Sequence, residues 1–496
     1  MGVVAKQASR ASIAVGIGIV LGAVNTIFVL PSAFEGQEAQ WGLIRILTAW
    51  GTILGQLSSF GMPSAILRFL PRFSPEEREG LLGMMLIIPL VLLSSIGAIL
   101  WGWGDVLLQR LDADNTGLLS THIGVFFSIT VLIAGLQFCR AMLNFLLKSA
   151  VASAVEEVWL KGSYLLLALA LLNGWLDFEL FIPLYVVTYL TGFLVLASQI
   201  HWNHIRIRWR PMWTQARGIF DYGTFSLLSM SAVIIATNLD FVMVGYFLGL
   251  SAVPLYTMGF FMGSVVSMPV RSTSMIFNGL TADKIAKSSP SSLGPLLKQS
   301  ARTQLLMSVA VMAGIWAGFQ PFEHILPPAY QDLEFVFMAI GLQRIILAST
   351  GVLSNILGLS QHYRLMLPVN LGLLIITVIS NYLFMKVFGW GLVGAALATM
   401  GTALWNNSWR AIIAWRKFRI HPFSKAWVAI VAIGLFCAQI FHWKAGWMGN
   451  AYVEAIVQGT LATGSIIGSA VLLGLVPEVA KVLEEKISWW PRRKKP

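Results

Sequence analysis

The stretch WGLIRILTAWGTILGQLSSFGM, residues 41–62, decides the class of fold. It is long enough to cross the ~30 Å hydrocarbon core of a bilayer, because a transmembrane α-helix needs about 20 mostly apolar residues. Arg45 nevertheless lies about one helical turn inside the stretch. An arginine at the bilayer centre costs about 2.5–3.5 kcal/mol, so its side chain either reaches back to the membrane surface or faces a polar interior.

Similar apolar stretches recur along the whole chain of 496 residues. Hydrophobic residues make up 57% of it, charged residues only 11%, and the mean hydropathy is +0.75, whereas soluble proteins carry about 25% charged residues. We predict an all-α polytopic membrane protein with about fourteen transmembrane helices, since lipid offers no partner for the backbone of an open sheet. The predicted ranges are 11–30, 41–62, 80–103, 122–147, 153–173, 177–199, 218–239, 250–276, 301–319, 333–358, 363–386, 390–414, 425–443 and 453–476.

Lysine and arginine gather in alternate connections between these ranges, for example HIRIRWR at 204–210 and the tail WWPRRKKP at 489–496. The intervening connections are acidic or neutral, as in PSAFEGQEAQ at 31–40. By the positive-inside rule both termini are cytoplasmic, which requires an even number of spans. The net charge of +12 therefore indicates membrane topology and attraction to anionic lipids, and we expect no nucleic-acid partner.

A weak internal repeat indicates how the helices are organised. AVNTIFVLPSAF at 23–34 aligns with ATNLDFVMVGYF at 236–247. Repeats of this kind are typical of transporters, whose substrate site lies between the repeats. We predict two pseudo-symmetric lobes of six helices, residues 1–200 and 201–420, followed by two further helices and a basic cytoplasmic tail at 421–496.

Four of the predicted helices combine an arginine with polar residues on one face. On 41–62 this face holds Arg45, Thr48, Thr52, Gln56 and Ser59, and three further helices contribute Gln137, Arg140 and Asn144, then Arg271, and then Arg344. No aspartate or glutamate falls in the middle third of a predicted span. The pattern predicts a cationic cavity for an anionic substrate such as a phosphate or pyrophosphate, and no carboxylate relay for proton or sodium coupling.

Each of these arginines also has a simpler interpretation. Arg45 and Arg271 lie near the ends of their spans, so each side chain has a surface role and a cavity role open to it. Arg140 and Arg344 lie deeper, and a cavity or an ion pair is favoured there. Pro269, one turn from Arg271 or less, is expected to kink its helix.

Other kinds of chemistry find no support in the sequence. There is no Walker-type lysine loop and no HExxH motif, so we expect a protein that is not an enzyme and uses no cofactor or metal. The two cysteines, Cys139 and Cys437, lie in apolar segments and are interpreted as small buried side chains.

Several motifs resemble those of a known family. NTIFVLPSAFEGQEAQWGLIRIL at 25–47, SSFGMPSAILRFLPRF at 58–73 and NLDFVMVGYFLGLSAVPLYTMGFF at 238–261 resemble polysaccharide biosynthesis membrane proteins, as does the region 356–400 with its GLVGAALAT segment. These are the lipopolysaccharide or O-antigen repeat-unit flippases of the multidrug/oligosaccharidyl-lipid/polysaccharide (MOP) exporter superfamily. The matching positions include Asn25, Trp41, Gly42, Gly61 and Asp240.

The resemblance implies a flippase in the cell inner membrane that moves an undecaprenyl-pyrophosphate-linked oligosaccharide by alternating access. It also implies membrane lipids, a polysaccharide polymerase and chain-length machinery as partners. Arg45, Gln56, Gln137, Arg140, Asn144, Arg271 and Arg344, with Asn25 from the amino-terminal motif, are then the candidate substrate-binding residues.

Rival functions make different demands on the sequence. A lipid II flippase is expected to carry basic residues in its first helix, and 11–30 has none; a multidrug antiporter is expected to have a buried carboxylate and about twelve spans. A polysaccharide polymerase or ligase needs a large outward loop with catalytic arginine and histidine. A scaffold requires no polar faces within its helices.

Overall fold

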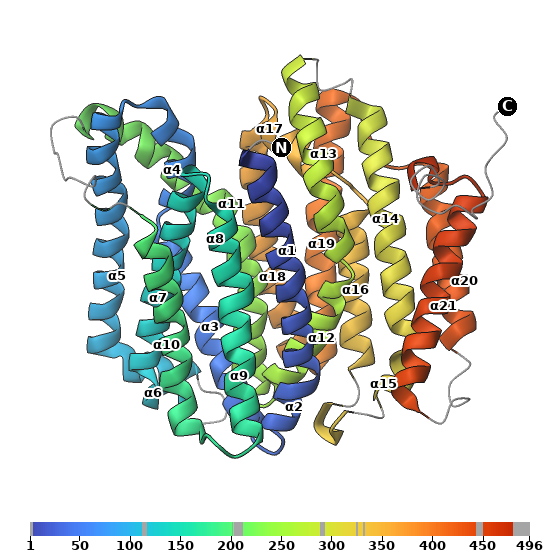
Figure 1. Cartoon of the computed structure of the whole chain (residues 1–496), viewed down its shortest axis with the longest axis horizontal. Coiled ribbons are helices and arrows are strands. Elements are labelled where there is room, and N and C mark those ends of the chain that lie inside the picture. Colours follow the sequence, from blue (N-terminus) through green and yellow to red (C-terminus); the bar gives the residue numbers. More distant parts are fainter. Residues whose placement is uncertain are drawn as a thin grey trace. The chain divides into compact units, whose positions relative to one another are not determined.

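The computed structural model describes residues 3–111, 117–200, 202, 212–287, 293–323, 326–330, 333–442 and 450–479, and every regular element among them is a helix (Figure 1). The basic segment 204–210 and the tail from residue 480 lie outside the described residues. By its internal contacts the chain divides into two compact units. The first is Met1–Met258 with Asn370–Ala395, and the second is Gly259–Val369 with Ala396–Pro496.

The helices of the first unit follow the amino-terminal half of the chain. They are α1 (Val3–Ala23), η1 (Val24–Val29), α2 (Leu30–Ala33), α3 (Glu38–Ser58), α4 (Met62–Phe69), η2 (Leu70–Arg72), α5 (Pro75–Leu111), α6 (Leu118–Thr121), α7 (Ile123–Phe145), α8 (Ser149–Ser153), η3 (Ala154–Trp159), α9 (Leu160–Leu172), α10 (Phe178–Ser198), α11 (Met212–Leu248) and η8 (Tyr382–Val387).

The second unit is built from later helices. They are α13 (Met268–Lys287), α14 (Gly294–Ala317), α15 (Phe319–Glu323), η6 (Pro328–Tyr330), α16 (Glu334–Ala348), α17 (Leu353–Leu359), η7 (Tyr363–Leu365), α20 (Lys425–His442) and α21 (Ala451–Leu472). The unit boundaries fall inside α12 (Ala252–Val265), α18 (Met366–Asn381) and α19 (Gly391–Phe418).

Each of the fourteen predicted ranges overlaps a helix, but fewer helices are apolar enough to cross a membrane unaided. Within the described ranges, eight helices have that length and composition, or nine if the bent pair α16 and α17 is one span. This confirms a multi-pass membrane protein, while the count of fourteen and the lobes 1–200 and 201–420 stay predictions. Residues 41–62 form α3, yet α3 is not among the eight. Its polar face lowers its hydropathy, and its contacts with α7 and α11 bury it inside the unit.

Two of the predicted helices are broken. Range 250–276 divides into α12 and α13, and Pro269 stands in the first turn of the second piece, where its missing N–H costs nothing. The helix is thus interrupted just before Pro269, and a kink at this proline stays a prediction. Range 333–358 divides into α16 and α17, which are bent by 51°. Gly351, in the connection, has φ 57°, a conformation that favours glycine.

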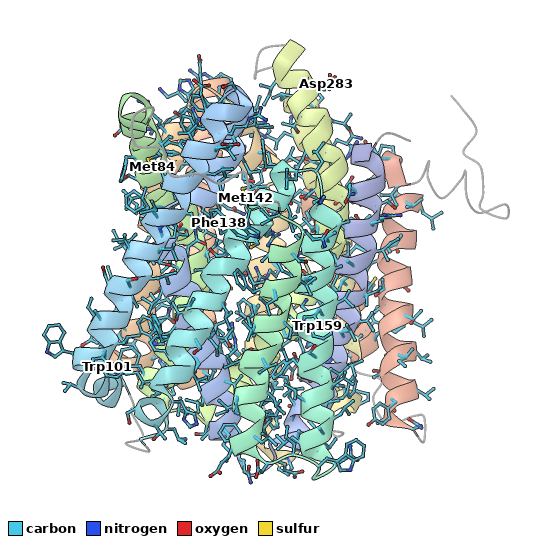
Figure 2. All side chains as sticks on the ribbon, turned by 60° about the vertical axis from the view of Figure 1, so that its left-hand side comes forward. Met84, Trp101, Phe138, Met142, Trp159 and Asp283 are labelled. Atoms are coloured by element: carbon cyan, nitrogen blue, oxygen red, sulfur yellow. The ribbon has the colours of Figure 1, made fainter. Side chains whose placement is uncertain are left out.

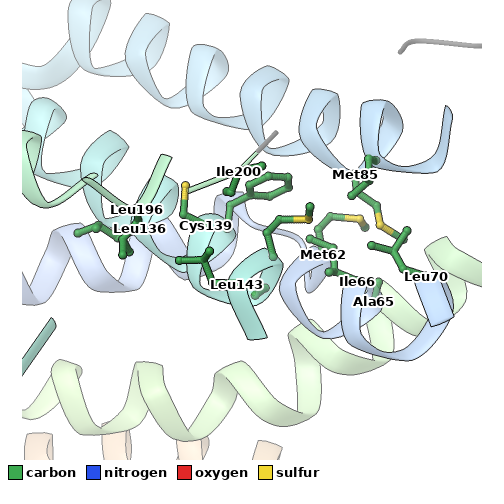
Figure 3. Close-up of a cluster of buried hydrophobic side chains, with 14 of the residues drawn as sticks. Met62, Ala65, Ile66, Leu70, Met85, Leu136, Cys139, Leu143, Leu196 and Ile200 are labelled. Atoms are coloured by element: carbon green, nitrogen blue, oxygen red, sulfur yellow. The ribbon is translucent and has the colours of Figure 1, made fainter. Parts of the chain in front are cut away.

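Apolar side chains have two different surroundings in the first unit. One group forms a core between α4, α5, α7 and α10 that includes Met62, Met85, Leu143 and Leu196, and Cys139 is fully buried there as predicted (Figure 3). Another group points outward, and Trp101 of α5, 95% exposed, projects away from its helix (Figure 2). Outward apolar and aromatic side chains suit contact with lipid and with the membrane interface.

In the second unit, α14 packs against α20, α21 and α16. Leu305, Val309 and Ala313 of α14 meet Ile430 and Ile466 in a common core. The two carboxy-terminal helices α20 and α21 are thus part of this unit's core.

Candidate functional site

The first unit contains a polar cavity of about 190 Å³ beside Arg45. Helix α3 supplies one wall, and η1, α2, α9, α10 and α12 supply the others. The lining residues are Thr26, Leu30, Trp41, Ile44, Arg45, Thr48, Tyr164, Tyr185 and Thr257. Of the predicted polar face of α3, only Arg45 and Thr48 reach this cavity.

The guanidinium of Arg45 lies over an aromatic ring inside the unit. Its Cζ is 3.6 Å from the centroid of the Phe241 ring of α11, a cation–π geometry. None of the carboxylates in the part of the chain that the structure describes lies within 4.0 Å of this guanidinium. Arg45 therefore lines a cavity of the first unit, and the choice between a surface role and a substrate role stays a prediction.

Hydroxyl groups beside Arg45 form a short chain of hydrogen bonds. The Thr48 hydroxyl donates to the Ile44 carbonyl at 2.8 Å and lies 3.1 Å from the Tyr185 hydroxyl, which is 3.2 Å from the Tyr189 hydroxyl. Because a hydroxyl has one proton, Thr48 accepts from Tyr185 and Tyr185 accepts from Tyr189. These hydrogen bonds hold Thr48 of α3 and Tyr185 and Tyr189 of α10 in one arrangement.

Tyr164 completes the polar wall from α9. Its ring lies 5.1 Å from the Tyr185 ring, centroid to centroid, and Tyr164 lines the cavity. A tyrosine hydroxyl can donate as well as accept, so Tyr164 brings a hydrogen-bond donor to this wall.

Gly42 allows α3 to approach the turn after α11 closely. A Cβ on Gly42 would overlap the carbonyl oxygen of Leu250 and lie 2.8 Å from its carbonyl carbon. The side chains of Trp41 and Arg45 on α3 and of Thr257 on α12 share one cavity because the helices come this near. The close approach is a physical reason for the glycine at position 42, one of the positions at which this chain resembles the family's motif.

The remainder of the predicted polar face of 41–62 is hydrogen-bonded to protein groups outside the cavity. The Gln56 side-chain amide donates to the Ser231 hydroxyl of α11 at 2.7 Å. Thr52 donates to the Thr48 carbonyl at 2.8 Å, and Ser59 to the Gln56 carbonyl at 2.8 Å. The polar face is therefore divided between a cavity and a helix contact, and is not one continuous lining.

Arg140 of α7 forms an ion pair. Its Nη1 lies 2.7 Å from a carboxylate oxygen of Glu156, which belongs to the π-helix η3. The neighbouring Glu157 pairs at 2.5 Å with Lys161, four residues further along the helix. Gln137 and Asn144, on the same helix as Arg140, are partly buried.

Arg344 of α16 has different surroundings in the second unit. Its Nη2 donates to the Ser264 hydroxyl at 2.9 Å, and its Cζ lies 5.1 Å from the centre of the Phe260 ring. Arg271, near the start of α13, is exposed. Asn25, the last candidate, is 3% exposed within η1 of the first unit.

The candidates thus have separate surroundings within their units, and their convergence on one cationic cavity stays a prediction. The sequence analysis also missed a buried carboxylate: Asp240 is 3% exposed and accepts a hydrogen bond from the Asn381 amide at 2.7 Å. The prediction covered only the middle third of each span, and Asp240 lies in the last third of α11. Range 218–239 ended too early, because α11 continues to Leu248 and takes Asp240 inside the helix. The apolar run FVMVGYFL after Asp240 was the available signal.

The aromatic partners of Arg45 were missed as well. Phe241, Tyr164 and Tyr185 come from three other helices, and nothing in their local sequence pairs them with α3.

Comparisons with known proteins agree with this architecture. Neither a protein-family model nor a curated protein matches the chain in sequence. A solved structure of the lipid II flippase MurJ in an inward closed conformation matches 94% of this chain and 98% of its own, with a TM-score of 0.75 at 13% identity.

Multidrug transporters of the MATE type match over a smaller part of the chain. The inward-facing form of a multidrug resistance MATE family transporter of the MOP superfamily matches 88% of this chain and 96% of its own, with a TM-score of 0.57 at 14% identity. A MATE protein in complex with MaL6 matches 83% and 96%, with a TM-score of 0.56 at 16% identity. The chain therefore has the fold shared by MurJ and the MATE transporters of the MOP superfamily.

Proposed function

We propose that this protein is a flippase of the MOP superfamily that moves a lipid-linked oligosaccharide, of the undecaprenyl-pyrophosphate type, across the cell inner membrane by alternating access. The observation that carries the proposal is the likeness in fold to a lipid II flippase over 94% of this chain and 98% of that one. The MATE structures match 88% and 83% of this chain at lower TM-scores. The oligosaccharide would serve the synthesis of cell-surface polysaccharide, including lipopolysaccharide.

The broken helix pair α16–α17 supports a substrate site in the second unit. Interrupted helices near the middle of the membrane commonly line the binding sites of transporters. Arg344 precedes the break, and its guanidinium is held by the neutral Ser264 hydroxyl and the Phe260 ring. The planar fork of N–H donors in arginine matches the oxygens of a pyrophosphate. Arg344 is therefore our first candidate for the pyrophosphate.

Arg140 is a weaker candidate than its depth in the sequence predicts. The Glu156 carboxylate at 2.7 Å already compensates its charge. A substrate phosphate would have to compete with that carboxylate for the Arg140 guanidinium.

Transport in reconstituted vesicles tests the proposal. Purified protein is placed in liposomes with a fluorescent undecaprenyl-pyrophosphate oligosaccharide, and the fraction accessible from outside is followed over time. We expect transport by the natural chain, its loss in Arg344→Ala, and partial retention in Arg344→Lys, which keeps the charge without the fork. Arg10→Gln, at an exposed position of α1, is the matched control.

Two results decide against the proposal. If the natural chain moves no lipid-linked oligosaccharide, the function is wrong. If Arg344→Ala transports normally while folding as the natural chain does, Arg344 is not in the site.

A lipid II flippase is the second candidate, favoured by the MurJ fold and disfavoured by the absence of basic residues in 11–30. Adding unlabelled lipid II to the same vesicles separates the two. Strong competition at equal concentration identifies lipid II as the substrate, and weak competition supports a different glycan.

A further inference from the structure

The cavity beside Arg45 is small. Its volume of about 190 Å³ lies below the ~300–1,000 Å³ of pockets that hold drug-sized ligands. The space directly beside Arg45 is therefore suited to a ligand smaller than the oligosaccharide proposed above.

The lining of the cavity offers positive charge and hydrogen-bond donors. Arg45 contributes a guanidinium, and Tyr164 contributes a hydroxyl, which can donate. The lining includes no carboxylate. A cation would require such a group, whereas the positive charge of Arg45 favours an anion.

The positive charge of Arg45 lies against an aromatic ring and away from the described carboxylates. One face of the guanidinium is covered by the Phe241 ring at 3.6 Å, and no described carboxylate compensates the charge. A buried charge without a partner is costly. The Tyr185 hydroxyl already donates its proton to Thr48. An anion in the cavity would give the Arg45 guanidinium a negatively charged partner.

We propose that this cavity binds one small inorganic anion, of chloride to phosphate size, between the Arg45 guanidinium and the Tyr164 hydroxyl. The anion joins α3 to α9, because the two groups lie on those helices. Binding therefore stabilises the first unit, and it is independent of which lipid-linked molecule the protein moves.

Thermal unfolding of the full-length protein in detergent provides the first test. Tryptophan fluorescence is followed at constant ionic strength while gluconate is replaced by chloride, bromide or phosphate. Binding to the folded state alone predicts a saturable rise in Tm, roughly 2–4 °C at high occupancy. We expect this rise to disappear in Arg45→Gln, to shrink in Tyr164→Phe, and to persist in Arg10→Gln, which removes an exposed arginine of α1.

Locating the bound anion in crystals provides the second test. It uses only the natural chain, so it does not depend on how well a variant folds. Crystals of the natural chain are soaked in bromide, and an anomalous peak is expected in the cavity between Arg45 and Tyr164. A peak there together with the Arg45-dependent rise in Tm supports the proposal. It is overturned if the cavity shows no peak, or if chloride and phosphate raise the Tm of Arg45→Gln as much as that of the natural chain. No lipid-linked substrate is present in either measurement, so their failure leaves the proposed transport to be judged by the vesicle assay.

Discussion

The replacement Gly42→Ala should damage both the stability of the first unit and the cavity of Arg45. The added Cβ would overlap the Leu250 carbonyl oxygen and lie 2.8 Å from the carbonyl carbon and 3.4 Å from Cα. Favourable contacts between carbon atoms begin at about 3.5 Å, so α3 must retreat by at least ~0.7 Å. The obstructing atoms belong to the backbone, in a turn where Gly249 has φ 90°, so no side-chain rotation relieves the overlap.

The expected cost is at the upper end of the ~1–3 kcal/mol measured for overpacked cores. For a unit of this size we expect a fall in Tm of roughly 4–10 °C. Tryptophan fluorescence of the purified protein in detergent measures it. The retreat also moves Trp41 and Arg45 away from Thr257, so the response of Tm to chloride should weaken.

Gly16→Ala is the matched control, because no atom lies within 4 Å of a Cβ at that position of α1. Alanine there removes the flexibility of a helical glycine, so Tm should stay equal or rise slightly. If Gly42→Ala melts at the same temperature as Gly16→Ala, the close approach of α3 to Leu250 does not exist as described.

Three further changes test other contacts. Glu156→Gln should lower Tm slightly, because it removes the partner of Arg140, whose side chain is 55% exposed, and a double-mutant cycle with Arg140→Gln should give a coupling of about 0.2–1 kcal/mol; additive losses would mean that the pair does not form. Asp240→Leu should lower the free energy of unfolding by about 1–3 kcal/mol, and Asp240→Asn by less, because leucine cannot accept the Asn381 amide proton; equal melting temperatures would contradict this. Gly61→Ala should reduce the yield of folded protein in size-exclusion chromatography, since Gly61 has φ 68° and L-residues pay about 1–2 kcal/mol there; a normal yield would refute the strain.

Features that depend on near neighbours in the chain were predictable. Each predicted range overlaps a helix, because long apolar segments form helices in a membrane, although several helices, such as α5 and α11, extend well beyond their ranges. The interruption just before Pro269 agrees with the missing backbone N–H, and the pair of Glu157 and Lys161 follows from the helical repeat. Each of these depends on atoms within about one turn of helix.

The boundary of α11 shows where a local argument fails. Asp240 was treated as the end of a span because a charged residue is costly in the bilayer. Burial inside the unit and the hydrogen bond from Asn381, 141 residues later in the chain, remove that cost. Only the packing of another helix against α11 could bring Asn381 next to Asp240.

The sequence by itself determined that this is a bundle of apolar helices in which arginines and polar residues share faces. Which side chain each arginine meets was decided by the tertiary structure: Phe241 and two tyrosine-bearing helices for Arg45, Glu156 for Arg140, and Ser264 for Arg344. The reason is physical. Helix formation is set by hydrogen bonds between residues four apart, whereas the partner of a side chain is set by which helices pack together, and many packings bury similar apolar area.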